Sequence, residues 1–400
     1  MGTVMVMGTT TKAKTKAPAA SKLQQLQVRL VRVLHWVGNL VLHWVQHLLF
    51  SSNPEARRIL IFRTGSFGDS LCAIPAICSI RKQFSNAQID ILTNTGHPNR
   101  NLVSIDQVIA PGILNRIINY QNQSRRKVLQ DIQKSRYDLV IQLPQYNAPW
   151  YRLLRDMVIF RFVAGIHAGF GWAWDNIPTF RQAQEAVFTA KNERLRLLEI
   201  LKKNGVLPLP ETTFALHWTN TDQEIAEAKI KAVLPKTDKP MIAIVAGAKR
   251  SQNRWQLTNF KAVCRQFASQ FSFILLGGPD DESLAKQIQD GEPGIYSLCG
   301  QLSPMQNAWV LKKCRMVLSN DTGLMHLSYA VGAPLVALFS ARDLPGRWYP
   351  PDIPSVRILR YFGLPCSACL SETCTRNVCM EKIEIAQVID AMDDLLRNSG

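Results

Sequence analysis

Short apolar runs alternate with helical stretches along most of the chain after residue 57. In the first half, runs at 59–62, 89–92 and 138–143 predict buried strands, and the patterns at 70–84 and 124–135 predict helices. Strands this short and this uniformly apolar are typical of parallel sheets that are covered on both faces. This half of the sequence therefore predicts an α/β domain.

A second series of the same kind begins near residue 236. Its strands are predicted at 241–247, 271–278, 295–300, 316–321 and 334–340. Its helices are predicted at 257–270, 280–290, 304–313 and 323–331, and helical patterns at 192–204 and 221–234 join the two series. Two such series predict an α/β fold of two Rossmann-like, doubly wound domains, which bind ligands beyond the carboxyl ends of their strands. We expect the two domains to face a central cleft that holds the site.

The N-terminal segment has a different pattern. Residues 1–22 are rich in Thr, Ala and Lys and are predicted to be disordered. In residues 23–50 apolar side chains recur every three or four positions and predict an amphipathic helix. Its apolar face consists of Leu26, Leu30, Val33, Val37, Leu40, Trp44 and Leu48. We expect residues 12–50 to lie on an anionic membrane surface. The alternative is a helix packed on the protein itself or on another subunit.

These patterns divide the chain into four parts. Residues 1–56 form the basic tail and amphipathic helix, 57–235 the first Rossmann-like domain and 236–382 the second. Residues 383–400 contain a further amphipathic helix.

Charge and cysteine placement narrow the class of protein. Lys and Arg outnumber Asp and Glu by 47 to 30, a net charge of +17, which favours an anionic partner. The chain has no nucleic-acid-binding motif, so we expect no specific nucleic acid. Five cysteines stand singly in apolar surroundings and are expected to be reduced core residues of a cytoplasmic protein. They are Cys72, Cys78, Cys264, Cys299 and Cys314.

The first candidate site is the turn that follows the strand at 59–62. Gly65, Ser66 and Gly68 permit close backbone approach by a ligand, and Asp69 comes at the start of the next helix. A helix cap alone would also explain an Asp at this position. The turn has no Lys-Ser/Thr pair and is therefore not a P-loop.

A second candidate site follows the strand at 316–321. Asp321, Thr322 and Gly323 open a helix whose N-terminal amides suit a diphosphate, and His326 lies in its first turns. Asp321 is placed to accept bonds from sugar or ribose hydroxyls. The alternative is a capped helix with a buried, hydrogen-bonded histidine.

Two further loops carry charges at strand ends. Gly247 ends a strand, and Lys249 and Arg254 follow it in a basic loop that suits a phosphate group, although a solvated basic loop is the alternative. In "GGPDDES" at 277–283, Asp280 or Glu282 is a candidate for bonding a ribose.

Taken in order, these segments resemble the family 9 glycosyltransferases, whose best-known members are ADP-heptose:lipopolysaccharide heptosyltransferases. The matching stretches are "TGSFGD", "NRWQLTNF", "GGPDDE", "SNDTGLMHLSYAVGAPLVALFS" and "RWYP". The resemblance covers roughly residues 57–395, and the Asn-Asp-Thr-Gly-x-x-His block is its most specific part. The Phe at position 67, the long basic loop and the N-terminal leader depart from the family pattern.

The resemblance implies a GT-B fold in which the first domain takes the acceptor, the second takes the donor and the last helix crosses back to the first domain. It implies inverting transfer with no metal ion and no other cofactor. Asp69 matches the proposed general base, and Arg254, the turn at 321–323 and His326 match donor positions, whereas Lys249 aligns less securely. The implied donor is a nucleoside-diphosphate sugar, with ADP forms favoured and a heptose as one candidate sugar. The implied acceptor is lipopolysaccharide or another cell-envelope glycan, lipid-linked or polysaccharide, at the inner face of the cytoplasmic membrane.

Two other functions fit parts of the pattern. A GT-B nucleotide-sugar epimerase would share the fold and the donor but release no acceptor product. A non-catalytic nucleotide or polyanion binder would share the basic loops, and the retained Asp69 argues against it.

A compact cysteine cluster stands outside these motifs. Cys366, Cys369, Cys374 and Cys379 fall within fourteen residues. Four thiols are enough for a structural zinc ion, but the spacing also allows an iron–sulfur cluster or disulfides. We expect a stapling or redox-sensitive loop and keep the metal site as an alternative.

Overall fold

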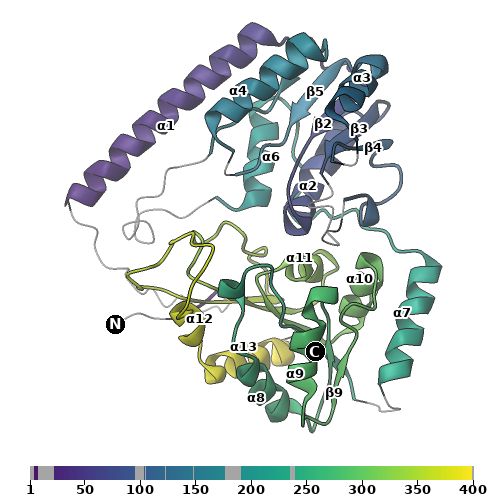
Figure 1. Cartoon of the computed structure of the whole chain (residues 1–400), viewed down its shortest axis with the longest axis vertical. Coiled ribbons are helices and arrows are strands. Elements are labelled where there is room, and N and C mark those ends of the chain that lie inside the picture. The colour runs from purple at the N-terminus through teal and green to yellow at the C-terminus, as the bar shows by residue number, and fades with distance from the viewer. Residues whose placement is uncertain are drawn as a thin grey trace. The chain divides into compact units, whose positions relative to one another are not determined.

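The computed structural model forms two compact units, each with its own parallel sheet (Figure 1). It describes residues 4–7, 22–94, 103, 105–121, 123–146, 148–175, 191–234 and 239–398. The N-terminal unit holds the described residues from 22 to 175 and from 191 to 217. The C-terminal unit holds residues from 218 onward together with the short strand at 4–7.

The N-terminal unit is built on a five-stranded sheet in the order β4-β3-β2-β5-β6, with every neighbouring pair parallel. The strands are β2 (Arg58–Phe62), β3 (Gln88–Thr93), β4 (Arg116–Asn119), β5 (Leu139–Gln142) and β6 (Gly169–Phe170). The helices are α1 (Lys22–Leu49), α2 (Phe67–Gln83), the 3₁₀ turn η1 (Ile105–Gln107), α3 (Arg125–Ser135), α4 (Trp150–Val158), the π-helix η2 (Ile159–Val163) and α6 (Glu193–Lys203). The three predicted strands and the helices over 70–84, 124–135 and 192–204 are confirmed.

The C-terminal unit has a seven-stranded sheet in the order β1-β12-β11-β10-β7-β8-β9. The strands are β1 (Val4–Met7), β7 (Met241–Val245), β8 (Ser272–Leu275), β9 (Ile295–Ser297), β10 (Met316–Asn320), β11 (Leu335–Phe339) and β12 (Val356–Tyr361). The helices are α7 (Asn220–Val233), η3 (Ser251–Asn253), α8 (Leu257–Phe267), η4 (Pro279–Asp281), α9 (Glu282–Gln289), α10 (Pro304–Lys313), α11 (Gly323–Ala330), α12 (Val378–Glu381) and α13 (Ile385–Asn398). The five predicted strands of this series are confirmed.

Two strands at one edge of this sheet escaped the sequence analysis. In β12, Arg357 and Arg360 interrupt the apolar run, and both arginines are nevertheless buried. β1 pairs antiparallel with β12, from Val4 opposite Tyr361 to Met7 opposite Ile358. The expectation of disorder for residues 1–22 is therefore wrong for the four residues of β1, and the stretch 8–21 lies outside the described residues.

Both ends of the C-terminal unit differ from the expected division of the chain. α7 belongs to this unit rather than to the first domain, because Trp218 beside it meets the Trp309 ring at 5.8 Å and the Lys312 ammonium at 4.9 Å. α13 packs Val388 and Leu395 into the core of the C-terminal unit. The described contacts join α13 to the C-terminal unit, and its crossing back to the first domain stays a prediction.

Each sheet has one point where the strand order reverses. In the N-terminal unit the chain starts at β2, adds β3 and β4 on one side and then β5 and β6 on the other. In the C-terminal unit β7, β8 and β9 lead one way and β10, β11 and β12 the other. Loops that leave two adjacent strands in opposite directions open a crevice at such a switch point, where ligands of doubly wound sheets bind. The switch points lie between β2 and β5 and between β7 and β10.

In the described part of the chain, no helix is both long enough and apolar enough to span a bilayer.

Candidate functional site

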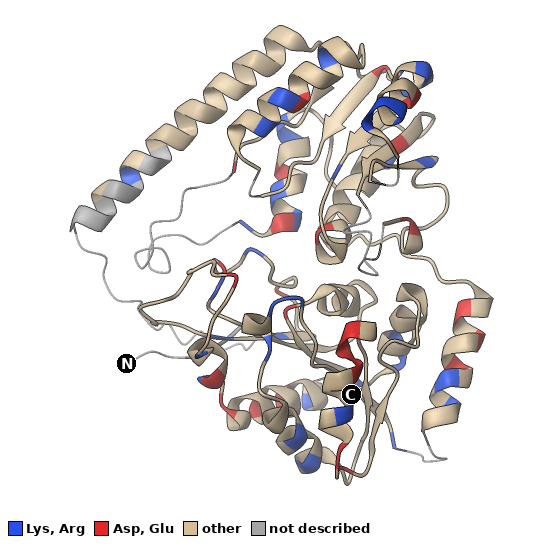
Figure 2. Ribbon diagram, viewed as in Figure 1, with Lys and Arg blue, Asp and Glu red and all other residues tan. Residues whose placement is uncertain are grey.

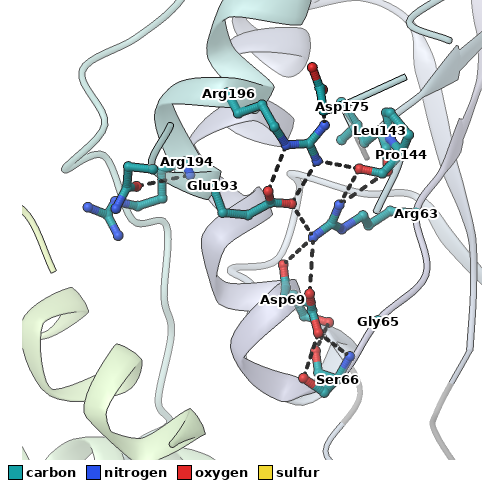
Figure 3. Close-up of polar contacts among 12 residues, drawn as sticks. Arg63, Gly65, Ser66, Asp69, Leu143, Pro144, Asp175, Glu193, Arg194 and Arg196 are labelled. Atoms are coloured by element: carbon teal, nitrogen blue, oxygen red, sulfur yellow. Dashed lines mark hydrogen bonds and ion pairs between the residues drawn. The ribbon is translucent and has the colours of Figure 1, made fainter. Parts of the chain in front are cut away.

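The first candidate site is the β2–α2 turn at the switch point of the N-terminal unit (Figure 3). Gly65 has φ +155°, a side chain there would collide with Asp69, and its amide donates to Asn94 Oδ1 at 2.8 Å. Ser66 is the N-cap of α2, so Asp69 stands at the third helical position and not at the cap itself. Gly68 lies inside the first turn of the helix.

The carboxylate of Asp69 is held from two sides. Its Oδ2 accepts the Ser66 amide at 2.8 Å and the Ser66 hydroxyl at 2.6 Å. Its Oδ1 lies 3.7 Å from Nη2 of Arg63, and the side chain keeps 19% of its surface exposed. The capping role and the site role are compatible here, because the two capping bonds go to Oδ2 and leave Oδ1 beside a cation. A fixed, partly exposed carboxylate is available to receive a proton.

A buried ionic network behind Asp69 holds that cation, and sequence reasoning missed it. Arg63 Nη2 donates to the Asp69 carbonyl at 3.1 Å and to Glu193 Oε1 at 3.1 Å. Glu193 also accepts from Arg196 at 2.7 and 2.8 Å, and Arg196 pairs with Asp175 at 2.7 Å. Arg63 Nη1 donates to the carbonyls of 143 and 144, which follow β5 across the switch point.

The network keeps Glu193 ionised. Burial acts to raise the pKa of Glu193, but the charges and hydrogen bonds of Arg196 and Arg63 outweigh burial and lower that pKa. A pair of arginines that shares one carboxylate in the interior is stable only when all three groups are in place. The sequence contained only a weak sign of this buried network. An Arg stands at the end of a buried strand, and charged residues interrupt the apolar helix pattern "ERLRLLEIL".

The second candidate site gathers three segments at the switch point of the C-terminal unit. Asn320, at the end of β10, donates to the Ala246 carbonyl after β7 at 2.7 Å and accepts the Trp255 amide at 3.2 Å. Asp321 accepts from Asn253 Nδ2 at 3.0 Å. These bonds fix the loop 247–254, which we call the donor loop, against the turn at 321–323. Asn253 and Asn320 were not singled out from the sequence, because a buried Asn has no distinctive pattern.

Asp321 has an unusual protonation equilibrium. Burial raises its pKa to about 7, and the neighbouring Asp343 acts in the same direction, whereas Arg250, Arg342 and Arg360 oppose the shift. A carboxyl group with this pKa is close to half-protonated at neutral pH. It can therefore either accept or donate a hydrogen bond to a hydroxyl of a bound sugar or ribose.

The cations of the donor loop are at least partly exposed. Lys249 is exposed, and Arg250 pairs with the exposed Glu372 at 3.2 Å. Arg254 donates from Nε to the Ala248 carbonyl at 2.9 Å, which curls the loop around it. The predicted basic loop therefore exists as a folded loop with surface cations, a suitable arrangement for a phosphate group.

Asp280 or Glu282 was predicted from the sequence as the ribose-binding acid after β8, but the structure places Asp281 beside Gly247. Asp280 and Glu282 are both exposed, and Glu282 lines a cavity of about 440 Å³ together with Tyr296 and Ser297. Asp281, which the sequence analysis passed over, points its carboxylate at Gly247 and Gly277, where any side chain would collide with it. Only glycine at 247 leaves room for this acid. Of the three, Asp281 is therefore the one beside the donor loop.

The start of α11 contains Thr322 and Gly323, both partly exposed, with Gly323 opening the helix. His326 is buried, and its Nδ1 lies 2.9 Å from the Tyr329 hydroxyl. A role of His326 in donor binding stays a prediction, and the observed contact is the buried, hydrogen-bonded one that the sequence analysis kept as the alternative.

The cysteine cluster borders the donor loop. Asn377, between Cys374 and Cys379, donates from Nδ2 to the Arg254 carbonyl at 3.0 Å. The nine cysteines lie within the described residues and form no disulfide, and the five single ones are buried as predicted. Among the described residues no three His, Cys, Asp or Glu side chains are arranged to hold a metal ion. The zinc alternative stays a prediction.

Two doubly wound α/β units that each present a polar switch point are the arrangement of a GT-B glycosyltransferase. A family model described as glycosyltransferase family 9 (heptosyltransferase) matches residues 125–379, more than half of the chain. The chain belongs to glycosyltransferase family 9. Asp69 lies outside the matched range.

Individual relatives are distant. Lipooligosaccharide heptosyltransferase 2 of Campylobacter jejuni is 24% identical over 158 residues, 37% of this chain and 48% of the relative, so the chain spans about half the length of that relative. Lipopolysaccharide heptosyltransferase 1 of Salmonella typhimurium is 22% identical over 305 residues, 72% of this chain and 89% of the relative. A structure of E. coli heptosyltransferase WaaC with ADP-2-deoxy-2-fluoro heptose has a TM-score of 0.55 at 18% identity, covering 84% of this chain and 99% of that one. This likeness confirms the GT-B fold.

Proposed function

We propose that this glycosyltransferase moves a heptose or related sugar from an ADP-sugar to a lipopolysaccharide acceptor, with inversion at the anomeric carbon and without a metal ion. The choice of donor and acceptor is supported by the names of the relatives and by the ADP-sugar bound to the E. coli neighbour. We place the reaction at the cytoplasmic face of the membrane that carries the acceptor.

The observation that carries the proposal is the held carboxylate of Asp69. In an inverting transfer an acceptor hydroxyl attacks the anomeric carbon while its proton passes to a base. Oδ1 of Asp69 would receive that proton, as the new glycosidic bond forms and the bond to the diphosphate breaks. Arg63 and Ser66 hold the carboxylate still, so that little reorganisation is needed at the moment of transfer.

The departing diphosphate would be stabilised by the C-terminal unit. Negative charge grows on the leaving oxygen as the sugar passes through an oxocarbenium-like state. Arg254, with Lys249 and the backbone amides of 321–323, supplies positive charge at that position. Asp281, which lies beside Gly247, and Glu282, which lines the cavity with Tyr296, are candidates for the nucleoside hydroxyls, and Asp280 stays a candidate from the sequence.

The test replaces Asp69 by Asn. Loss of a general base lowers turnover by about 10²–10⁴-fold, while the affinity for ADP should stay near that of the wild type. Turnover is followed as ADP release and as mass of the glycosylated acceptor, and ADP affinity by calorimetry. Asp106→Asn, at an exposed acid of the same unit, is the matched control.

Three results would contradict the proposal. Wild-type turnover in a well-folded Asp69→Asn variant would remove the base from Asp69. Conversion of the donor to its epimer without an acceptor product would identify an epimerase instead. ADP-sugar binding with neither reaction would identify a non-catalytic relative.

A further inference from the structure

The N-terminal helix α1 is held on its unit by both polar and apolar contacts, and most of its large apolar side chains face outward. Asn39 makes two bonds to the backbone of Trp174, from Nδ2 to the carbonyl at 2.6 Å and from the Trp174 amide to Oδ1 at 2.9 Å. Gln46 accepts the Gly171 amide at 3.2 Å and donates to Asn204 at 3.2 Å. Gly38 lies so close to the Trp174 ring that no side chain would fit.

The anchoring residues Asn39, Leu42 and Gln46 recur every three or four positions and so form one stripe of the helix, with Gly38 next to Asn39. A helix on the surface of a water-soluble protein normally buries its apolar face and exposes its polar one. α1 packs Leu42, Val45 and Leu49 on its unit, but it leaves ten other large apolar side chains exposed. The residues left exposed are Leu26, Leu30, Val33, Leu34, Trp36, Val37, Leu40, Val41, Trp44 and Leu48, with exposed fractions from 43% to 74%.

A second exposed apolar segment adjoins α1. α4 and η2 run beside it (Figure 1), and Arg161 of η2 donates from Nε to the Leu49 carbonyl at the end of α1 at 2.8 Å. This segment exposes five large apolar side chains: Trp150, Tyr151, Val158, Phe162 and Val163. Two adjoining elements of one unit therefore leave apolar and aromatic surface uncovered, more than a soluble monomer usually shows.

The charges on these elements have one sign. Residues 1–54 contain no acid, and Figure 2 shows no acidic residue along α1. The single acid in 150–167 is Asp156, which is buried and paired with Arg155 at 2.6 Å. Arg152 and Arg155 are exposed on α4. A cationic rim complements an anionic lipid surface, and Trp and Tyr are the side chains that favour the interface of a bilayer.

We propose that α1, α4 and η2 together form a docking face for an anionic lipid bilayer, which we call the membrane face. In this orientation the exposed apolar and aromatic side chains lie at the boundary between headgroups and acyl chains, and the arginines contact the headgroups. The proposal deepens the expectation that α1 alone contacts a membrane, because it adds α4 and η2 and explains why α1 leaves most of its large apolar side chains exposed. It rests on the proposed function only in assuming that the acceptor lies at a membrane.

The test measures binding of the full chain to vesicles by flotation. Vesicles of phosphatidylglycerol and phosphatidylcholine should bind the protein, and vesicles of phosphatidylcholine alone should bind it about tenfold less. The double variants Trp36→Ser/Trp44→Ser and Trp150→Ser/Phe162→Ser should each weaken binding by about tenfold, since each removes apolar area from the bilayer contact. Leu207→Ser is the matched control, because Leu207 is as exposed as Trp44 (74%) but lies outside the three elements.

The outcomes separate this proposal from the proposed function. Normal vesicle binding by the α4–η2 variant would overturn the composite face, and loss of self-association in place of vesicle binding would show that the surface joins copies of the chain. Transfer to a water-soluble acceptor fragment without lipid should be unchanged in both double variants. Failure of that transfer in the wild-type protein would count against the proposed function and leave the vesicle result standing.

Discussion

At the switch point of the N-terminal unit the arginines are buried and already paired, whereas in the donor loop of the C-terminal unit the cations are at least partly exposed. Arg63 and Arg196 share Glu193 in the interior, and Arg63 also contacts Asp69. Arg250 pairs with the exposed Glu372, and Lys249 lies at the surface. Exposed pairs of this kind are weak and leave the cations able to bind an incoming anion.

The comparison indicates how one fold serves two tasks. On the proposed function, the proton acceptor should not move, and its neighbours are fixed before a substrate would arrive. A diphosphate would bring its own charge, so its cations should stay accessible until it binds. Three predictions test this difference, beginning with the largest expected effect.

The largest effect is expected from Glu193→Gln. The substitution leaves the guanidiniums of Arg63 and Arg196 buried with less compensating charge, which should lower the free energy of unfolding by about 3–5 kcal/mol. Urea denaturation measures the change. Glu199→Gln on the same helix is the control, because Glu199 pairs near the surface with Lys191 and Lys203 and should contribute less than about 1 kcal/mol. Equal losses from the two variants would mean that the network is not a special support of the site.

A smaller effect is expected from Arg254→Ala, and it should appear in binding rather than in stability. A charge-assisted bond to a phosphate contributes about 1.5–3 kcal/mol, so ADP affinity should fall about 10- to 100-fold. Calorimetry with ADP measures it. Arg265→Ala removes a cation of α8 that pairs with Glu292, and it should leave ADP affinity unchanged. Unchanged affinity in Arg254→Ala would exclude Arg254 from the diphosphate site.

The smallest effect is expected from the titration of Asp321. Its pKa is raised above the unfolded value to about 7, so the folded protein binds the extra proton between pH 4 and 7. Stability from this group is therefore present at low pH and is lost as pH rises through 7. Asp321→Asn removes this dependence. The stability of the variant relative to the wild type should therefore be higher at pH 8 than at pH 5. Melting temperatures at the two pH values measure the difference, and a variant whose relative stability is the same at both would contradict the raised pKa.

The alternation of apolar runs was enough to predict much of the fold. Eight strands were placed from short apolar runs, because strands buried in a parallel sheet have a composition that other elements rarely share. β12 was missed because Arg357 and Arg360 break its apolar run, and their partners, Asp394 and the carbonyls of 340 and 343, come from elsewhere in the unit. A buried charge can be recognised only when the residues that compensate it are known.

Some residues of the candidate sites could likewise be predicted from the sequence, and others could not. Asp69 and Asp321 were predicted because they follow strands in glycine-containing turns, which local sequence specifies. Asp281 was missed among three neighbouring acids, because the orientation of each carboxylate depends on Gly247, more than thirty residues away.

The sequence by itself determined the two α/β series, the amphipathic character of both terminal helices and the positions of the turns that carry the chemistry, because periodicity and turn residues act over a few neighbouring positions. Only the tertiary structure decided which face of each helix is buried. α13 turns its apolar face to the core, while α1 turns Asn39 and Gln46 inward, since partners at 171, 174 and 204 satisfy their polar groups. Contacts between residues far apart in the sequence thus determine which face of a helix is buried, and a local sequence pattern does not specify these contacts.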